Sequence, residues 1–324
     1  MTKVGSASAV AGAIAKGELL LGEYPDGGAA SCPVAIAQGR NYGPVLWVQA
    51  CVHGSEGGGI VGMHRVLRQL DLQTLKGAIV FAAVSNPFGF RANQRLTPQD
   101  GRNLNRAFPG SASGDVTDRI AHRLFTEASA VADAVIDLHT GGDYVIASHY
   151  MIYRDDGSDA GKISARLARS SGVGKMWNAA PDVFAGAAYL EFVRSGTPAV
   201  LFECGGGGQV TPRDLDRFEQ AVLGCCRALG MLPGGPERGA SSYLYGGGHA
   251  TLRASRGGFF VPTGEAGDLY KEGDEIGTTA DVFGERLEVL RSPFKLAWVA
   301  SMRRPYLPVF AGDDLAVMIE VIHS

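Results

Sequence analysis

The sequence predicts an α/β fold, with a mainly parallel or mixed sheet covered by helices, followed by a small all-β barrel or sandwich. Strand-like and helix-like segments alternate from about residue 33 to residue 230, as in sheets with helices on both faces. After a linker at 232–239 that is rich in proline and glycine, the pattern changes to short alternating runs with Gly-Asp turns. We therefore expect two domains, residues 1–232 and residues 233–324.

Each predicted element has its own signal. Apolar runs predict four strands, and periodic apolar positions predict four helices. The strands are expected at 45–52, 77–84, 133–139 and 198–203, and the helices near 57–70, 115–131, 159–171 and 211–229. The last helix has Thr211 as its N-cap and Pro212 at its first position, and Gly230 ends it.

The C-terminal residues contain an imperfect internal repeat. The segment 252–255 leads to 272–276, and the segment 290–293 leads at nearly the same spacing to 311–315. Two similar β-rich halves of this kind resemble a lipoyl- or biotinyl-carrier fold. Lys295 is the nearest candidate for a carrier lysine, but it lacks the usual tight-turn context, so a structural or oligomer-forming role is expected.

Composition excludes several classes of function. The chain has 324 residues and a net charge of −3 without a basic block, which argues against a nucleic-acid partner. No apolar stretch approaches the ~18 residues of a membrane span, so no membrane association is expected. The five cysteines are scattered and odd in number, which favours a reducing cytoplasm over a disulfide framework. A homo-oligomer is compatible with these features.

Two histidines at strand ends suggest a metal site. The run 45–52 leads directly to His53-Gly54-Ser55-Glu56, and the run 134–138 leads to His139 and two glycines. Ligands of open α/β sheets bind beyond the carboxyl ends of strands, so these side chains are expected to meet there. Catalytic zinc commonly takes three such ligands and keeps one position open. The alternative is that both histidines bond carbonyl groups at the core edge, and that Glu56 is a helix N-terminal acid.

A third apolar run and a long loop add further polar residues. The run 198–202 delivers Glu203 and then Cys204 and four glycines. The loop 95–110 is polar and punctuated by Pro and Gly, and long loops without secondary structure are usually functional. It contains Arg95, Arg102 and Arg106, whose planar guanidinium groups suit carboxylates. Alternatively, Glu203 is a buried structural carboxylate, and the three arginines are charged residues of a surface loop.

In this order and spacing, the motifs resemble the succinylglutamate desuccinylase/aspartoacylase family of the zinc carboxypeptidase clan. They are H-G-x-E, N-P at 86–87, R-x-x-P-x-D-G-x-N-L-N-R-x-F-P-G from Arg95, D-L-H and a strand-end E-x-G-G-G. The match spans about residues 45–208, and the chain looks most similar to bacterial deacylases that include N-acetyl-diaminobutyrate deacetylases. Asn103 departs from the pattern, because many relatives have Asp there.

The resemblance implies a zinc-carboxypeptidase-like sheet with one zinc ion per chain, and it assigns roles to seven residues. His53, Glu56 and His139 match the metal ligands, Glu203 the general base and acid, Arg95 the residue that polarises the scissile carbonyl, and Asn105 and Arg106 the pair that binds the substrate carboxylate. A Glu of this kind takes a proton from the attacking water, while a preorganised arginine stabilises the oxyanion.

The expected activity is hydrolysis of the amide of a small N-acylated amino acid or amine by a cytoplasmic zinc enzyme. Two alternatives remain at this point: a zinc carboxypeptidase acting on short peptides, and a non-catalytic metal-binding scaffold. A C-terminal domain folded over the site would exclude peptides. The acyl group, the physiological metal and any roles of Cys204 and His149 are left open by the sequence.

Overall fold

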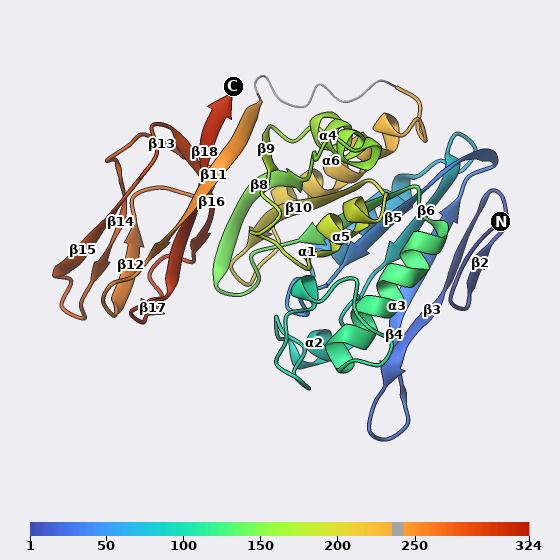
Figure 1. The fold of residues 1–324 in the computed structure, drawn as a ribbon, viewed down its shortest axis with the longest axis horizontal. Coiled ribbons are helices and arrows are strands. Elements are labelled where there is room, and N and C mark those ends of the chain that lie inside the picture. Colours follow the sequence, from blue (N-terminus) through green and yellow to red (C-terminus); the bar gives the residue numbers. More distant parts are fainter. Residues whose placement is uncertain (235–242, 324) are drawn as a thin grey trace.

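A computed structural model of the protein describes residues 1–234 and 243–323 (Figure 1). Most of the predicted linker at 232–239 lies outside the described residues, which stop at 234 and resume at 243. The domain boundary predicted between residues 232 and 233 remains a prediction. Twelve strands form one mixed sheet, in the order β13-β16-β18-β11-β9-β8-β10-β7-β5-β6-β4-β3. In the N-terminal part, the strands of this sheet are β3 (Ala13–Glu23), β4 (Ala29–Gln38), β5 (Asn41–Ala50), β6 (Lys76–Ala82), β7 (Ala134–His139), β8 (Val145–Tyr153), β9 (Lys175–Asn178) and β10 (Ala199–Gly206).

Helices cover both faces of this part of the sheet. The helices are α1 (Gly58–Gln69), α2 (Pro87–Ala92), α3 (Val116–Val131), α4 (Asp159–Ser170), α5 (Ala188–Arg194) and α6 (Pro212–Ala228), with a short 3-10 turn η1 (Leu104–Arg106). Side chains of α1, α4 and α6 share one apolar core, and those of α2, α3 and α5 share a second core on the opposite face. Successive residues of β5 alternate between the two cores, with Trp47 in one and Leu46 and Val48 in the other.

Strand order brings the predicted site residues to one edge. Strands β6, β5, β7 and β10 are parallel neighbours, so their carboxyl ends lie at the same edge of the sheet. Ala50 of β5 pairs with Leu138 of β7, and His139 pairs with Glu203 of β10. Strand β8 runs antiparallel to β10 and places Tyr150 opposite Glu203.

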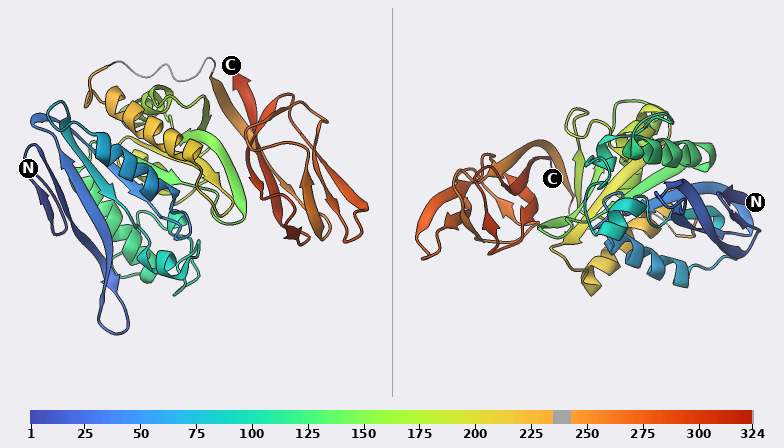
Figure 2. Two further views of the ribbon diagram at one scale, coloured as in Figure 1. Left: turned by 180° about the vertical axis from the view of Figure 1, so that it is seen from behind. Right: turned by 90° about the horizontal axis from the view of Figure 1, so that it is seen from below.

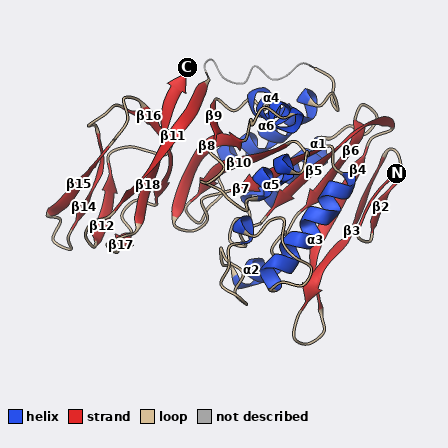
Figure 3. Cartoon of the chain, in the orientation of Figure 1, coloured by secondary structure: helices blue, strands red, loops and turns tan. Residues whose placement is uncertain are grey.

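Beyond α6, the described residues contain strands and no helix (Figure 3). They are β11 (Leu244–Arg253), β12 (Gly258–Pro262), β13 (Leu269–Tyr270), β14 (Glu275–Ala280), β15 (Arg286–Arg291), β16 (Ala297–Arg303), β17 (Pro308–Val309) and β18 (Asp314–His323). Strands β15-β14-β12-β17 form a separate sheet, whereas β11 pairs with β9 and β16 pairs with β8. The C-terminal β region therefore has a core of its own and also continues the main sheet, as the two views in Figure 2 show.

The internal repeat is present as the same turn built twice. Gly273 donates from its amide to the carbonyl of Ser292, and Gly312 donates in the same way to Ala254. Both glycines have φ near +90°, at 84° and 94°, a conformation that L side chains rarely adopt. Each turn is closed by an aspartate side chain that accepts from the backbone amide three residues earlier, at Lys271 and Phe310.

All eight predicted strands and helices are present, with shifted ends. The sequence pattern predicted no element before residue 33, yet a small hairpin, β1 (Thr2–Val4) and β2 (Ala7–Ala9), and the long strand β3 are found there. One side of β3 is exposed, and Lys16 and Glu18 interrupt its apolar residues, so it lacks the continuous run that identifies a buried strand. Among the described residues, no helix has the length and apolar character needed to cross a membrane.

Candidate active site

A strained turn directs His53 out of the sheet. Cys51, directly after β5, has φ of 52°, and its buried thiol donates to the carbonyl of Glu56 at 3.3 Å. A positive φ is unfavourable for a non-glycine residue, and residues in this conformation are often found at functional sites. Gly54 packs against the backbone of α2, and a Cβ atom there would lie 2.0 Å from the carbonyl carbon of Gly89. The glycine of the H-G-x-E motif is therefore required by packing.

His53, Glu56 and His139 converge as predicted. The Nδ1 atom of His53 lies 2.8 Å from Oε1 of Glu56, and the Nδ1 atom of His139 lies 2.8 Å from Oε2. The two Nδ1 atoms are 3.2 Å apart, and all three residues are buried. The structure thus brings together residues that are up to 86 positions apart in the chain.

The second nitrogen of each ring faces a different oxygen. His53 Nε2 lies 3.0 Å from Oδ1 of Asn103, and His139 Nε2 lies 3.0 Å from Oδ2 of Asp137. The Asp137 contact has ion-pair distance, although its angle is poor for a hydrogen bond. Such outer partners fix the tautomer and direct the other nitrogen to a metal. Asn103, the departure from the family pattern, thus lies beside a predicted ligand rather than among the three.

Burial and charge act against each other in this cluster. Burial alone would lower the pKa of His139, but the carboxylates of Asp137 and Glu56 outweigh it and hold that pKa well above its usual value. Burial lowers the pKa of His53 to about 4. Burial would raise the pKa of Glu56, but both imidazoles outweigh it and hold that pKa well below its usual value. The cluster therefore keeps the carboxylate of Glu56 ionised between the two imidazole rings, and the ring of His53 is neutral at neutral pH.

These residues fit one divalent cation. Their donor atoms, two imidazole nitrogens and a carboxylate oxygen, lie within 4.8 Å of one another. Two ligands at 2.0–2.1 Å from a tetrahedral zinc ion are ~3.3 Å apart, close to the 3.2 Å between the Nδ1 atoms. Without a cation, one carboxylate must satisfy two buried rings that face each other. The donor set is consistent with one bound divalent metal ion.

Glu203 lies beside this cluster in the wall of a cavity. It is partly buried, and burial raises its pKa to about 8, with Glu56 and Asp137 adding to the shift and His139 and Arg95 opposing it. Burial, together with Glu203, raises the pKa of the neighbouring Tyr150 well above its usual value, so the phenol stays protonated. The carboxyl group of Glu203 is thus positioned to change protonation state near neutral pH.

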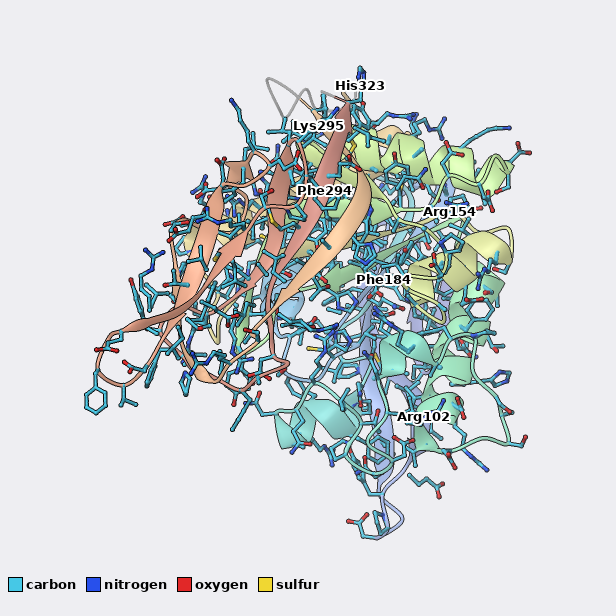
Figure 4. The ribbon with its side chains drawn as sticks, turned by 60° about the vertical axis from the view of Figure 1, so that its left-hand side comes forward. Arg102, Arg154, Phe184, Phe294, Lys295 and His323 are labelled. Atoms are coloured by element: carbon cyan, nitrogen blue, oxygen red, sulfur yellow. The ribbon has the colours of Figure 1, made fainter. Side chains whose placement is uncertain are left out.

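Of the loop arginines, Arg95 reaches the site and Arg102 does not. Arg95 is half exposed, and its Nη1 atom lies 2.6 Å from Oε1 of Glu56. Arg102 forms a two-pronged ion pair with Asp118 of α3 at 2.6 and 2.9 Å, on the side of the molecule near α2 (Figure 4). It holds the loop to the helix, and it does not compete with Arg95 for a position at the cluster.

Asn105 and Arg106 come later in the same loop, and Asn105 packs against the start of α5. The Oδ1 atom of Asn105 accepts from the amide of Ala188 at 2.9 Å, which leaves its Nδ2 atom 3.3 Å from Nε2 of His139. The guanidinium of Arg106 lies 5.1 Å from the ring centre of Phe184, and burial lowers its pKa. Among the described residues, no carboxylate lies within ion-pair distance of Arg106.

Tyr189 is a site candidate that the sequence did not reveal. It is fully buried on α5, and its hydroxyl has no hydrogen-bond partner among the described residues. Arg106 lies close enough to lower the pKa of this phenol, although burial dominates and raises it. An unpaired buried hydroxyl beside an unpaired guanidinium is typical of a place for a polar ligand. A lone tyrosine in a helix gives no signal in one sequence.

A cavity of about 660 Å³ is lined by Ser55 and Thr140, which are neighbours of the cluster residues in the chain. Strand-end loops form one side of it, with residues such as Arg95, Thr140 and Glu203. Strands β16 and β18 of the C-terminal β region form the other side, through residues such as Ser301 and Leu315. The C-terminal region therefore closes one side of the cavity. Lys295, the candidate carrier lysine, precedes β16 and lies at the end of β16 and β18 that is away from the cavity, close to Phe294 and His323 (Figure 4).

Two residues left open by the sequence lie outside this cavity. Cys204 is buried, and its thiol donates to Asp214, an acid of the capping box of α6. His149 is not among the lining residues, although Ala147 and Tyr150 on either side are. Burial and the cations Arg217, Lys175 and Arg213 lower the pKa of His149 to about 3. Neither residue contacts the metal cluster.

Comparison with known proteins agrees with this geometry. The succinylglutamate desuccinylase/aspartoacylase catalytic domain matches residues 42–229, more than half of the chain. An N-alpha-acetyl-L-2,4-diaminobutyric acid deacetylase from Halomonas elongata is 26% identical over 307 residues, which cover 92% of this chain and 88% of that protein.

Solved structures share the whole fold, including the C-terminal β region. The product-bound ectoine utilization protein EutE (DoeB) from Ruegeria pomeroyi superposes with a TM-score of 0.84 at 21% identity, covering 98% of this chain and 100% of that one. A succinylglutamate desuccinylase from Silicibacter sp. TM1040 gives 0.83 at 21% identity, covering 99% and 100%. The chain belongs to the succinylglutamate desuccinylase/aspartoacylase family, whose members are deacylases.

Proposed function

We propose that the protein hydrolyses the amide bond of a small N-acylated amino acid or amine with one zinc ion per chain. The observation that supports this most directly is the buried His53-Glu56-His139 set, whose chain neighbours Ser55 and Thr140 line a cavity together with Glu203. A divalent cation held there supplies Lewis acidity at the carbonyl oxygen and lowers the pKa of water to about 7.

The side chains around the cluster suit the proton transfers of amide hydrolysis. Glu203, in the cavity wall beside the cluster, accepts a proton from the attacking water and returns it to the leaving amine. Arg95 is half exposed and can move from Glu56 to stabilise the negative charge that develops on the carbonyl oxygen.

The substrate carboxylate binds between the remaining polar groups. Arg106 and Asn105 are the predicted pair for this role, and the free hydroxyl of Tyr189 adds a third donor. The desolvated guanidinium of Arg106 can form two parallel hydrogen bonds with a carboxylate.

Size and closure of the cavity favour a small substrate. A volume of about 660 Å³ lies within the usual ~300–1,000 Å³ range of small-molecule sites. Strands β16 and β18 form one wall, so an extended peptide has little room on that side. The Halomonas relative acts, by its name, on N-α-acetyl-L-2,4-diaminobutyrate, which is the first substrate to try. Peptide cleavage and a purely structural metal remain the alternatives to exclude.

A substrate panel tests the proposal. Purified protein is assayed with N-acetyl, N-succinyl and N-formyl amino acids and with blocked dipeptides, and zinc is quantified on the same sample. We expect release of the free amine from an N-acyl amino acid, loss of activity on chelation and recovery on adding zinc. Cleavage of the dipeptides alone would indicate the carboxypeptidase alternative. Zinc-loaded protein that turns over no member of the panel would contradict an enzymatic role.

A further inference from the structure

The cavity wall has an acidic side chain without a cationic partner. Besides Glu203, the acids that line the cavity are Asp143 and Asp314. Asp314 forms an ion pair with Arg253 at 2.7 Å. Asp143 is half-buried, and it makes no ion pair among the described residues.

The cations near Asp143 have other partners. Arg95 and Arg303, the two arginines that line the cavity, are paired with Glu56 at 2.6 Å and with Asp313 at 3.3 Å. Arg304 flanks the same loop, but its Nη1 atom donates to the carbonyl oxygen of Gly207. Within residues 1–234 and 243–323, no cation therefore neutralises the negative charge of Asp143, which is half-buried and so partly shielded from water.

Asp143 is also close to the reacting centre. It follows Gly142, where a Cβ atom would lie 3.4 Å from Oγ of Ser55 and 3.9 Å from Cγ of Glu56. The loop that contains Asp143 thus packs directly on the turn that supplies two of the three metal ligands. A carboxylate one residue further along this loop is within reach of a substrate whose acyl amide lies at the cluster.

We propose that Asp143 binds a protonated amino group of the substrate, so that the enzyme selects N-acyl diamino acids over N-acyl amino acids with neutral or acidic side chains. The inference rests on the proposed function, since it names the substrate class of that site. In an N-α-acyl 2,4-diamino acid the free ammonium is four bonds from the scissile nitrogen, an extended distance of about 5 Å. The carboxylate then faces Arg106 and the ammonium faces Asp143, which fixes the orientation of the amide.

Three substrates of nearly equal size isolate the charge. They are N-α-acetyl-L-2,4-diaminobutyrate, N-acetyl-L-norvaline and N-acetyl-L-glutamate, with cationic, neutral and anionic side chains. kcat/KM is measured for each with the parent protein, Asp143→Asn and Asp143→Lys. Asp314→Asn is the matched control, because Asp314 lines the same cavity but is paired with Arg253.

The expected result is a change of selectivity. The parent prefers the diaminobutyrate over the norvaline substrate by about tenfold or more, and Asp143→Asn removes most of that preference, mainly through KM. Asp143→Lys shifts the preference toward the glutamate substrate, which a general loss of structure would not produce. Asp314→Asn keeps the ratio of the parent. An unchanged ratio in Asp143→Asn, or an equal loss in Asp314→Asn, overturns the inference.

A binding measurement separates this inference from the proposed function. Calorimetry compares L-2,4-diaminobutyrate with L-norvaline on the zinc-loaded parent and on Asp143→Asn. A preference for the diamino acid that disappears in the variant supports the role of Asp143 even if no substrate is hydrolysed, in which case only the proposed function falls. Hydrolysis of N-acetyl-L-norvaline without any charge preference, in either assay, retains the proposed function and overturns the role of Asp143.

Discussion

The two parts of the molecule contribute to the cavity in different ways. The N-terminal part supplies titratable groups from the carboxyl ends of parallel strands, including the buried His53 and His139 and the partly buried Glu203. The C-terminal β region supplies a wall of small and apolar residues, such as Ser301 and Ala316, together with the charged Arg303 and Asp314, and none of its described residues belongs to the metal cluster. The candidate catalytic groups thus come from the N-terminal part, whereas both parts line the cavity, and different substitutions can probe each contribution.

This difference follows from how each part is built. Parallel strands place their carboxyl ends at one edge, where loops bring polar groups together. In the C-terminal region, β16 has Trp298 and Ala300 in the core of the N-terminal part and Val299 and Met302 in the core of its own part. One strand thereby joins two apolar cores, which makes the wall rigid. We expect substitutions in the metal cluster to change metal content and kcat, and substitutions in the C-terminal wall to change KM at constant metal content.

The largest effect is expected from His139→Ala. The change removes a ligand and leaves the carboxylates of Asp137 and Glu56 buried without that ring, so zinc is lost and kcat/KM falls by more than about 10³-fold. Metal content and turnover are measured on the same sample. His64→Ala, an exposed histidine of α1, is the control and should retain both. Full zinc content with full activity in His139→Ala would rule out the proposed ligand set.

Glu203→Gln separates chemistry from metal binding. Zinc content should remain, while kcat falls by roughly 10²–10⁴-fold because the proton acceptor is lost. Hydrolysis at the parent rate in the zinc-loaded variant would show that another group is the base.

The same substitution has a defined effect on stability. The folded-state pKa of Glu203, about 8, lies above its ordinary value of 4.5, so the folded protein holds more protons between these pH values. This contribution to stability is complete below about pH 4.5 and is lost as pH rises through 8. Metal-free Glu203→Gln should equal the parent in free energy of unfolding near pH 4 and exceed it by on the order of 2–4 kcal/mol at pH 9. Urea denaturation at both pH values measures this, and a constant difference would contradict the raised pKa.

Tyr189→Phe tests the missed substrate contact. Its buried hydroxyl has no partner, so its removal should cost less than about 0.5 kcal/mol of stability, but it should raise KM about tenfold. Tyr153→Phe, on the opposite face of the sheet, is the control, and its KM should equal that of the parent. An unchanged KM in Tyr189→Phe would remove this residue from the site.

Ser301→Phe tests the C-terminal wall. A larger side chain on β16 narrows the cavity and should raise KM by up to about tenfold while zinc content stays constant. Val289→Phe, on an exposed position of β15, is the control for the substitution type. If Ser301→Phe lowers zinc content and leaves KM unchanged, the division between the two parts is wrong.

The smallest effect is expected from Arg102→Ala. This arginine is partly exposed and paired with Asp118, and exposed ion pairs contribute about 0.2–1 kcal/mol. Thermal unfolding should shift only slightly, and kcat/KM should change about threefold or less. A loss as large as that of a metal-ligand variant would show that Arg102, rather than Arg95, acts on the substrate.

Much of the fold and the metal site could be predicted because the signals are local. Buried parallel strands appear in the sequence as continuous apolar runs. The helix that follows Thr211 is predicted by its N-cap residue and by the proline at its first position. Strands β3 and β8 were missed because polar residues interrupt their apolar runs. The candidate metal cluster was predicted because His53 and His139 directly follow such runs and Glu56 is three residues after His53. Tyr189 was not predicted from the sequence, because it becomes a candidate only through the position of its hydroxyl near Arg106, where the described residues offer it no hydrogen-bond partner.

The amino-acid sequence by itself determined the strand-end ligands, the glycines that follow them and the repeated C-terminal turns. Only the tertiary structure decided that residues of β16 and β18 line the cavity. It also decided which loop arginine contacts which acid, with Arg102 paired to Asp118 and Arg95 to Glu56. The physical reason is that residue type and spacing constrain backbone conformation locally. Which charges remain unpaired, as at Asp143 and Arg106, depends on contacts between segments that are distant in the chain.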